Sequence, residues 1–197
     1  MLAGELETKP GSRISTASLA AAVGVSEAAL YRHFASKAQM FEALIEFAEQ
    51  TIFGVFNQIM NEQAEAETRC HHMATALLRF AERNPGITRV LLGDILVGEQ
   101  QRLRARVSQF FARVETQFKQ VMRESNLHQS AELDATQVAA IARLLLTVVV
   151  GRLDQFVRDD FAASPAQDWE LQWTLVCRGI FATPTTDAPA IARAVAT

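Results

Sequence analysis

The segment from Ile14 to Phe34 constrains the fold of this chain most, because it has the pattern of two short helices joined by a tight turn. Gly24 permits the first helix to stop abruptly, and the hydroxyl of Ser26 stands where it can cap the second. Apolar residues at helical spacing let the two helices pack on each other: Leu19, Ala20 and Val23 in the first, and Val25, Leu30 and Phe34 in the second. The segment is therefore predicted to be a helix-turn-helix.

The second of these helices has an outer face that suits the major groove of DNA. Ala28 and Arg32 point away from the apolar side of the helix, and such a slim outer face can enter the groove. Arg32 is expected to contact guanine or a phosphate, and Ala28 and Ala29 to allow close approach and methyl contact. Phosphate contacts are expected from Ser15, Thr16, Ser26, Tyr31, His33 and Lys37. Packing within the helix-turn-helix is the alternative role for Tyr31 and His33.

The remaining sequence offers little to an enzyme or a metal site. It carries no Ser/His/Asp set and no phosphate-binding glycine loop, so neither enzymatic activity nor a cofactor is expected. Cys70, His71 and His72 are consecutive, and neighbouring side chains on a helix point about 100° apart, which disfavours a shared metal ion. No metal site is therefore predicted.

Several features favour a cytoplasmic protein without a membrane partner. Residues 1–5 do not resemble a signal peptide. The longest apolar run, Val138–Val150, is too short to span a membrane and contains Arg143. Cys70 and Cys177 lie on separate predicted helices, which favours reduced thiols over a disulfide framework.

Charge is distributed unevenly along the chain, whose formal net charge is −3. Residues 1–68 hold 4 lysines and arginines against 9 acids, residues 69–123 hold 10 against 4, and residues 124–197 hold 5 against 9. The basic centre has three interpretations, which are DNA contact, contact with an acidic partner, or neutralisation of the acidic ends. Arg102 and Arg106 share one helix face and are expected to be solvated, with a phosphate or partner patch as the alternative.

Beyond the helix-turn-helix the pattern predicts an all-α helical bundle. Helices are expected over about residues 36–61, 67–82, 87–96, 99–124, 134–161 and 168–181. Ser36 with Gln39, and Asp134 with Gln137, have the spacing of capping boxes. We therefore expect a DNA-binding domain over 1–35, a regulatory and dimerisation domain over 36–182, and a flexible tail over 183–197.

The last two long helices are expected to form a dimer interface. Apolar residues surround the Val138–Val150 segment on nearly every side, and a helix of that kind needs cover all round. A matching apolar stripe lies on the final helix: Trp169, Trp173, Val176 and Ile180. Two such pairs would close a four-helix interface about a twofold axis. The alternative is a central helix within a monomer.

The helix-turn-helix resembles that of the TetR family of bacterial DNA-binding regulators. The resemblance lies in the order Thr16, Leu19-Ala20, Val23–Ser26, Leu30-Tyr31, His33-Phe34 and Lys37. Further runs are similar to the nucleoid occlusion branch of that family: Ser26–Phe34, Leu44–Phe47 and Glu82–Arg89, with a looser match over Arg152 to Phe161. Family members usually begin with a longer first helix, of which Met1–Leu6 matches only the end, so fewer phosphate contacts are expected.

The resemblance implies a TetR-like homodimer that binds palindromic chromosomal DNA and associates with the nucleoid. Members of that branch inhibit assembly of the tubulin-like division protein FtsZ, which is the expected protein partner. A ligand-responsive TetR-type repressor is the first alternative. A dimer that has lost DNA binding and acts only through protein contacts is the second.

A partner groove is expected where two helices of the body meet. Phe47 lies about 120° from the main apolar stripe of its helix, so it is expected to be only partly covered. Arg83 and Asn84 end the following helix, where a guanidinium and an amide can hold a peptide. Matching positions in the resemblance support Phe47, Arg83 and Asn84, with Arg79 added. The alternatives are a core aromatic at Phe47 and an Arg83 that stabilises the helix end.

Overall fold

The computed structural model of the chain describes residues 26–62, 65–93, 101–126 and 133–181. Regular structure within these ranges is entirely helical, which confirms the all-α prediction. The described helices are α3 (Glu27–His33), α4 (Lys37–Asn61), α5 (Ala66–Arg83), α6 (Pro85–Leu92), α7 (Gln101–Asn126), α8 (Ala135–Arg158) and α9 (Trp169–Ile180).

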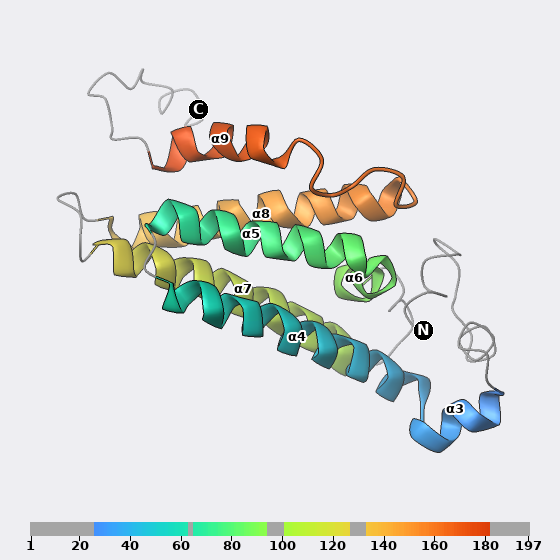
Figure 1. Cartoon of the computed structure of the whole chain (residues 1–197). Coiled ribbons are helices and arrows are strands. Elements are labelled where there is room, and N and C mark those ends of the chain that lie inside the picture. The colour runs from blue at the N-terminus through green and yellow to red at the C-terminus, as the bar shows by residue number, and fades with distance from the viewer. Residues whose placement is uncertain (1–25, 63–64, 94–100, 127–132, 182–197) are drawn as a thin grey trace, which may run out of the picture.

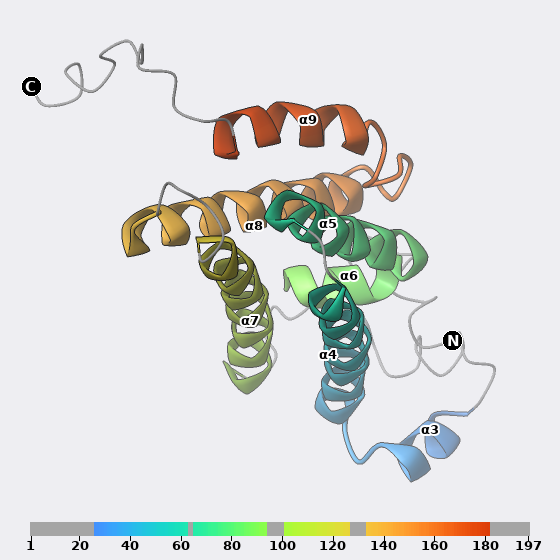
Figure 2. The ribbon, with the colours of Figure 1, turned by 60° about the vertical axis from the view of Figure 1, so that its left-hand side comes forward.

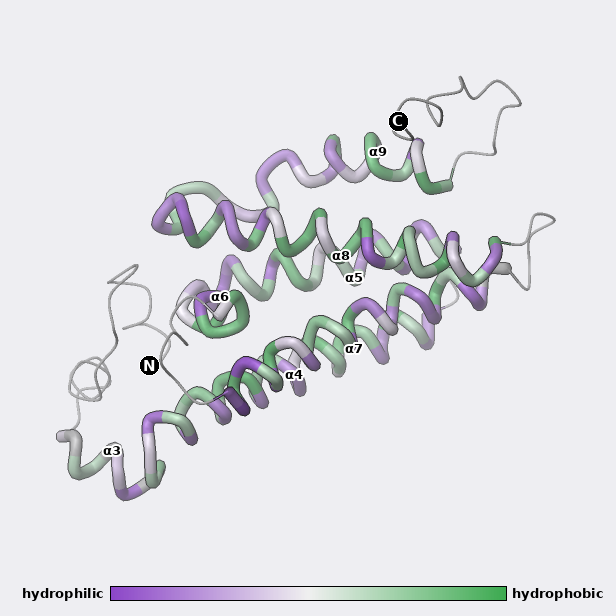
Figure 3. The backbone as a smooth tube through the Cα atoms, turned by 180° about the vertical axis from the view of Figure 1, so that it is seen from behind, coloured by the Kyte–Doolittle hydropathy of each residue, from purple (hydrophilic) through white to green (hydrophobic). Residues whose placement is uncertain are grey.

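The helices are stacked in layers, with the short α3 projecting from one end (Figure 1). α4 and α7 lie side by side, α5 and α8 cover them, and α9 lies outermost on the far side from α4 (Figures 1 and 2). α6 closes the body at the end nearest α3 (Figure 1). Along α7 the residues alternate between hydrophilic and hydrophobic (Figure 3), as expected for a helix with one buried face.

Two apolar clusters hold the bundle together. The larger one joins buried residues of α4, α5, α7 and α8, among them Phe56, Leu78, Phe118 and Val149. The smaller one lies at the end nearest α3 and consists of Met40, Phe41, Ile45, Val90, Leu103 and Val107, with Phe34 packed against it. The smaller cluster therefore fastens the segment after α3 to the body.

Local start signals place two of the long helices correctly. Asp134 accepts a hydrogen bond from the Gln137 amide and its own amide donates to the Gln137 side chain, which confirms the capping box of α8. The Ser36 hydroxyl caps α4 by accepting from the amide of Gln39. The Gln39 side chain accepts from the amide of Ala35, so this box reaches one residue further back than predicted.

The expected boundaries of the short helix after α5 are wrong at both ends. α6 begins at Pro85, because proline needs no hydrogen-bond acceptor at the first helical position. It ends at Leu92, followed by Gly93 with a φ of 78°, a left-handed conformation that stops a helix. α8 also ends earlier than expected, at Arg158, and left-handed residues follow at Asp160 and Phe161.

The tryptophan stripe of α9 faces the protein's own core, so its assignment to the dimer interface is wrong. Trp169 and Trp173 are 3% and 5% exposed within the single chain. The indole of Trp169 donates to the Thr75 hydroxyl at 2.8 Å, and both rings lie against His71 of α5. Hydrogen bonding and ring contacts thus dock α9 onto α5.

Other apolar residues of the last two helices are exposed. Leu171 and Leu175 of α9 are 66% and 60% exposed, and Leu144 of α8 is also exposed. Within the described ranges α8 is the one helix long and apolar enough to cross a membrane, but only 28% of its most apolar window is buried. Its buried residues, such as Leu145 and Val149, belong to the core. Leu144 is the large apolar residue of α8 that the described part of the chain leaves exposed.

Both cysteines are buried free thiols, as predicted. Burial raises the pKa of Cys177 to about 12, and it raises the pKa of Cys70 as well. Each thiol therefore stays protonated at neutral pH and is a poor nucleophile.

Candidate functional site: a DNA-reading helix and a partner surface

The predicted DNA-reading helix is α3, and its start is held as the sequence indicates. The Ser26 hydroxyl accepts a hydrogen bond from the amide of Ala29 at 3.1 Å, which confirms the predicted cap. Ala28 and Arg32 are exposed on this short helix, and Tyr31 is 44% exposed. The exposed side of α3 thus offers a guanidinium, a phenol and a small residue to an approaching duplex.

The structure describes only some of the other residues that are predicted to contact DNA. Ser15, Thr16 and the first helix of the helix-turn-helix lie outside the described residues, as does the side chain of His33. Ala29 is partly buried. Lys37 opens α4, with its ammonium 5.3 Å from the centre of the Phe41 ring.

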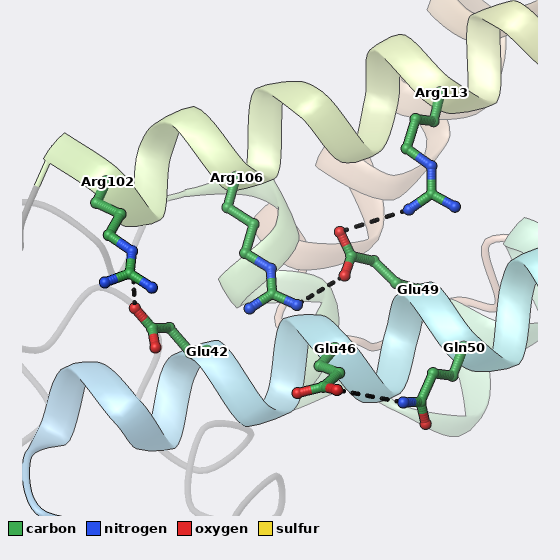
Figure 4. Close-up of polar contacts among 7 residues, drawn as sticks. All are labelled: Glu42, Glu46, Glu49, Gln50, Arg102, Arg106 and Arg113. Atoms are coloured by element: carbon green, nitrogen blue, oxygen red, sulfur yellow. Dashed lines mark hydrogen bonds and ion pairs between the residues drawn. The ribbon is translucent and has the colours of Figure 1, made fainter.

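Three arginines of α7 form ion pairs with two glutamates of α4 (Figure 4). Arg102 lies 3.4 Å from Glu42, and Arg106 lies 2.8 Å from Glu49. Arg113 is a second cation near Glu49, at 3.9 Å. The hydrogen bond to Glu49 raises the pKa of Arg106. Part of the basic centre of the sequence, namely Arg102, Arg106 and Arg113, thus neutralises acids of α4.

These ion pairs confirm the expectation for Arg102 and correct it for Arg106. The two side chains share one face of α7, as predicted, and that face meets α4. Arg102 is 77% exposed and therefore solvated as expected, whereas Arg106 is 29% exposed and paired with Glu49. The sequence pattern fixes which residues share a helix face and leaves open which element that face meets.

A half-exposed aromatic lies where α4 and α5 meet. Phe47 is 49% exposed, as its offset from the α4 stripe predicts, and its ring centroid lies 6.2 Å from that of Phe80 on α5. Phe80 itself is buried, so it supports Phe47 from below. Sequence reasoning missed Phe80, although it precedes Arg83 by one helical turn.

Polar residues flank Phe80 in the last turn of α5 and just after it. Arg79 and Arg83 are exposed, and Arg83 is the last residue of the helix. The Asn84 side chain donates to the carbonyl of Phe80 at 2.9 Å, and the Asn84 carbonyl accepts from the Thr88 hydroxyl at 3.0 Å. Asn84 therefore fixes the corner between α5 and α6. We call Phe47, Phe80, Arg79, Arg83 and Asn84 the α4–α5 surface.

One carboxylate lies among these cations. Glu82 pairs with Arg79 at 2.8 Å. Hydrogen bonds from Ser164, in the α8–α9 connection, and from Arg79 hold the pKa of the Glu82 carboxyl below its usual value, and the charge of Arg83 acts in the same direction. Glu82 is thus ionised at neutral pH and partly neutralises the α4–α5 surface.

A cavity of about 180 Å³ lies beside the α8–α9 connection, lined by residues that include Arg152, Asp159 and Gln172. Arg152 donates to the carbonyls of Pro165 and Gln167 and to the side chain of Gln172. Its guanidinium therefore holds the connection in place. The cavity is smaller than the roughly 300–1,000 Å³ of small-molecule sites.

Solved TetR regulators share this fold. The chain is similar to the TetR family transcriptional regulator PfmR from Thermus thermophilus, with a TM-score of 0.68 and 21% identity over 89% of this chain and 94% of that one. It is also similar to the transcriptional regulator FadR from Bacillus subtilis, solved in complex with stearoyl-CoA, with a TM-score of 0.71 and 14% identity over 90% and 95% of the two chains. At these identities the likeness concerns the fold.

Sequence comparison is more specific. Residues 5–44 match the model of the bacterial regulatory proteins of the TetR family, and residues 64–180 match the SlmA-like model described as a tetracyclin repressor-like C-terminal domain. The chain is 53% identical over 175 residues to the nucleoid occlusion factor SlmA of Shewanella halifaxensis, covering 89% of this chain and 88% of that protein. It is 54% identical over 172 residues to SlmA of Alteromonas mediterranea, covering 87% and 88%.

These matches determine the class of the protein. It is a DNA-binding regulator and not an enzyme. The chain belongs to the TetR family of bacterial regulators, in its SlmA-like branch.

Proposed function

We propose that this protein is a nucleoid occlusion factor that binds palindromic chromosomal sites as a homodimer and inhibits FtsZ ring assembly over the nucleoid. Identity above 50% to proteins of that name, over most of both chains, supports the proposal. A location in the cytoplasm, on the nucleoid, is part of the proposal. The domain division into 1–35, 36–182 and 183–197 is part of the same proposal.

DNA recognition is assigned to α3 and the residues around it. Arg32 reads base edges or binds a phosphate, and Ala28 and Ala29 allow close approach. Ser15, Thr16, Ser26, Tyr31, His33 and Lys37 contact phosphates. The exposure of Ala28, Tyr31 and Arg32 supports this assignment.

Dimerisation is assigned to the open apolar face of α8 and α9. Leu171 and Leu175 follow each other by one helical turn, and exposed leucines on a surface helix are typical of an interface. A twofold dimer carries two copies of α3, as a palindromic site requires.

Partner binding is assigned to the α4–α5 surface, and the observation that carries it is the half-exposed Phe47, which packs on Phe80 of α5. The same helix carries the exposed Arg79 and Arg83. An exposed aromatic on one helix and guanidinium groups on the next can bind a peptide that carries both apolar and acidic side chains. The FtsZ tail is the segment expected to bind there. Asn84 contributes by holding the corner that positions Arg83.

The test is binding of an FtsZ tail peptide, measured by fluorescence anisotropy with and without palindromic DNA. We expect micromolar affinity that is lost in Phe47→Ala and in Arg83→Asp, because the first removes the aromatic contact and the second reverses the charge. Arg123→Asp is the matched control for Arg83→Asp, since it reverses the charge of an exposed arginine elsewhere, on α7.

Each other outcome refutes part of the proposal. Peptide binding that survives both substitutions would exclude the α4–α5 surface. No peptide binding, with DNA binding intact, would favour a ligand-responsive repressor instead. Peptide binding without DNA binding would favour a regulator that acts only through protein contacts.

A further inference from the structure

One of the cations of the α4–α5 surface, Arg79, already forms an ion pair with a carboxylate of the same helix, Glu82. The Oε2 atom of Glu82 lies 2.8 Å from a guanidinium nitrogen of Arg79, three residues earlier on α5. Arg83 follows directly in sequence, and its charge also acts on the Glu82 carboxyl. An acidic partner would meet this carboxylate at the same place.

Because the Arg79–Glu82 ion pair is exposed, a carboxylate from another molecule can replace Glu82 on Arg79. Arg79 is 55% exposed and Glu82 is 32% exposed, so their ion pair is weak and competes with solvent and with other anions. Ser164, on the connection between α8 and α9, also favours the charged form of the Glu82 carboxyl and so lowers its pKa. The Glu82 carboxylate therefore keeps a stabilising neighbour when it leaves Arg79.

We propose that Glu82 is a specificity-determining residue that competes with the acidic partner segment for Arg79. A peptide carboxylate takes the place of the Glu82 carboxylate on the Arg79 guanidinium, and Glu82 stays with Ser164. Peptides with one weakly placed acid do not displace Glu82, whereas peptides with several acids next to an apolar anchor do. This inference rests on the proposed function, because it concerns the same surface.

The experiment measures binding of the fluorescent FtsZ tail peptide to the full-length protein and to Glu82→Gln. We expect the variant to bind about twofold to fivefold more tightly at about 0.05 M salt, because Arg79 becomes available and one repulsive charge is removed. The gain is expected to fall towards unity at about 0.5 M salt, where exposed charges are screened.

Glu65→Gln is the matched control. Glu65 precedes the same helix, and no hydrogen bond of its side chain caps the helix. It lies about 25 Å from Glu82 along α5, at about 1.5 Å per residue, and its loss changes the net charge equally. Affinity of Glu65→Gln for the peptide should match that of the unaltered protein.

A double-mutant cycle with Arg79→Ala separates competition for Arg79 from general repulsion. In the Arg79→Ala background, the gain from Glu82→Gln should fall to less than half of its value in the unaltered protein. Circular dichroism and thermal unfolding of each variant confirm that the fold is kept.

The outcomes distinguish this inference from the proposed function. Peptide binding that is lost in Phe47→Ala but unchanged in Glu82→Gln would refute the competition for Arg79. The assignment of the partner to the α4–α5 surface would be kept. An equal gain in both Arg79 backgrounds also overturns the competition. If no peptide binds to the unaltered protein or to Glu82→Gln, the proposed function itself fails.

Discussion

Arg32 is the single arginine of α3, and its side chain is exposed on the helix that we assign to DNA. Arg32→Ala should weaken binding to the specific palindrome by about 1–3 kcal/mol, because a bidentate contact to guanine is worth that much in discrimination. Binding to random DNA should change less. Titration of labelled duplexes with specific and random sequences measures both.

Arg123→Ala is the control for Arg32→Ala. Arg123 is an exposed arginine near the end of α7, so its loss changes the net charge equally. If both substitutions weaken binding to all sequences by the same factor, Arg32 acts through general charge alone and does not read bases.

At the residue scale, the sequence reveals what lies within one helix. The exposure of Phe47 follows from its angle to the apolar stripe of α4, and the cap at Ser26 follows from its place before α3. The influence of Ser164 on the pKa of the Glu82 carboxyl could not be predicted in that way. The two residues belong to separate elements that only the tertiary fold brings together.

At the scale of elements, the α4–α7 ion pairs hold the helix that leads from α3 into the body. Glu49 has two arginine partners, Arg106 at 2.8 Å and Arg113 at 3.9 Å. Glu49→Gln should lower the free energy of unfolding by about 1 kcal/mol, because it leaves two guanidinium groups without their carboxylate. Urea unfolding at low salt measures the change.

Glu46→Gln is the matched control for Glu49→Gln. Glu46 lies on the same helix, is exposed, and accepts a hydrogen bond from the side chain of Gln50 (Figure 4). Its substitution should leave the stability within about 0.5 kcal/mol, as for most surface changes. Equal losses in the two variants would show that the cross-helix pairs add nothing to stability.

The predicted boundaries of elements are correct where a side chain marks the start of a helix. Asp134 caps α8, and Ser36 caps α4. The predicted ends of α6 are wrong. Pro85 at the first position and the left-handed Gly93 after the last position set these ends through the backbone. A periodic apolar pattern does not register either effect.

At the scale of the whole molecule, the open leucines of α9 carry the proposed dimer. Leu175→Glu should raise the dimer dissociation constant by more than about 100-fold, because it buries an unpaired carboxylate in the interface. Leu175 is 60% exposed in the single chain, so each protomer should stay folded. Sedimentation velocity reports the oligomeric state, and affinity for the palindrome should fall with it.

Phe47→Glu is the matched control for Leu175→Glu. It places the same charge at another exposed apolar position, on the α4–α5 surface. This variant should stay dimeric and lose the FtsZ peptide, whereas Leu175→Glu should keep peptide binding. A dimer that survives Leu175→Glu would move the interface to another face of the body.

The overall class of the molecule could be predicted because the helix-turn-helix and the long amphipathic stripes are local patterns. The surface on which the tryptophan stripe packs could not be predicted. Trp169 and Trp173 are spaced as an interface stripe would be, but they pack on α5. Helical spacing indicates that a face needs cover, and it does not distinguish the chain's own core from a second copy.

The long α4 helix connects two of the proposed binding regions. It begins at Lys37, among the phosphate contacts, and carries Phe47 ten residues later, about 15 Å along its axis. Two ligands of one protein are linked reciprocally, so any factor by which DNA strengthens binding of FtsZ is also the factor by which FtsZ strengthens binding of DNA. With a positive coupling, the division protein would itself prolong the residence of its inhibitor on the chromosome.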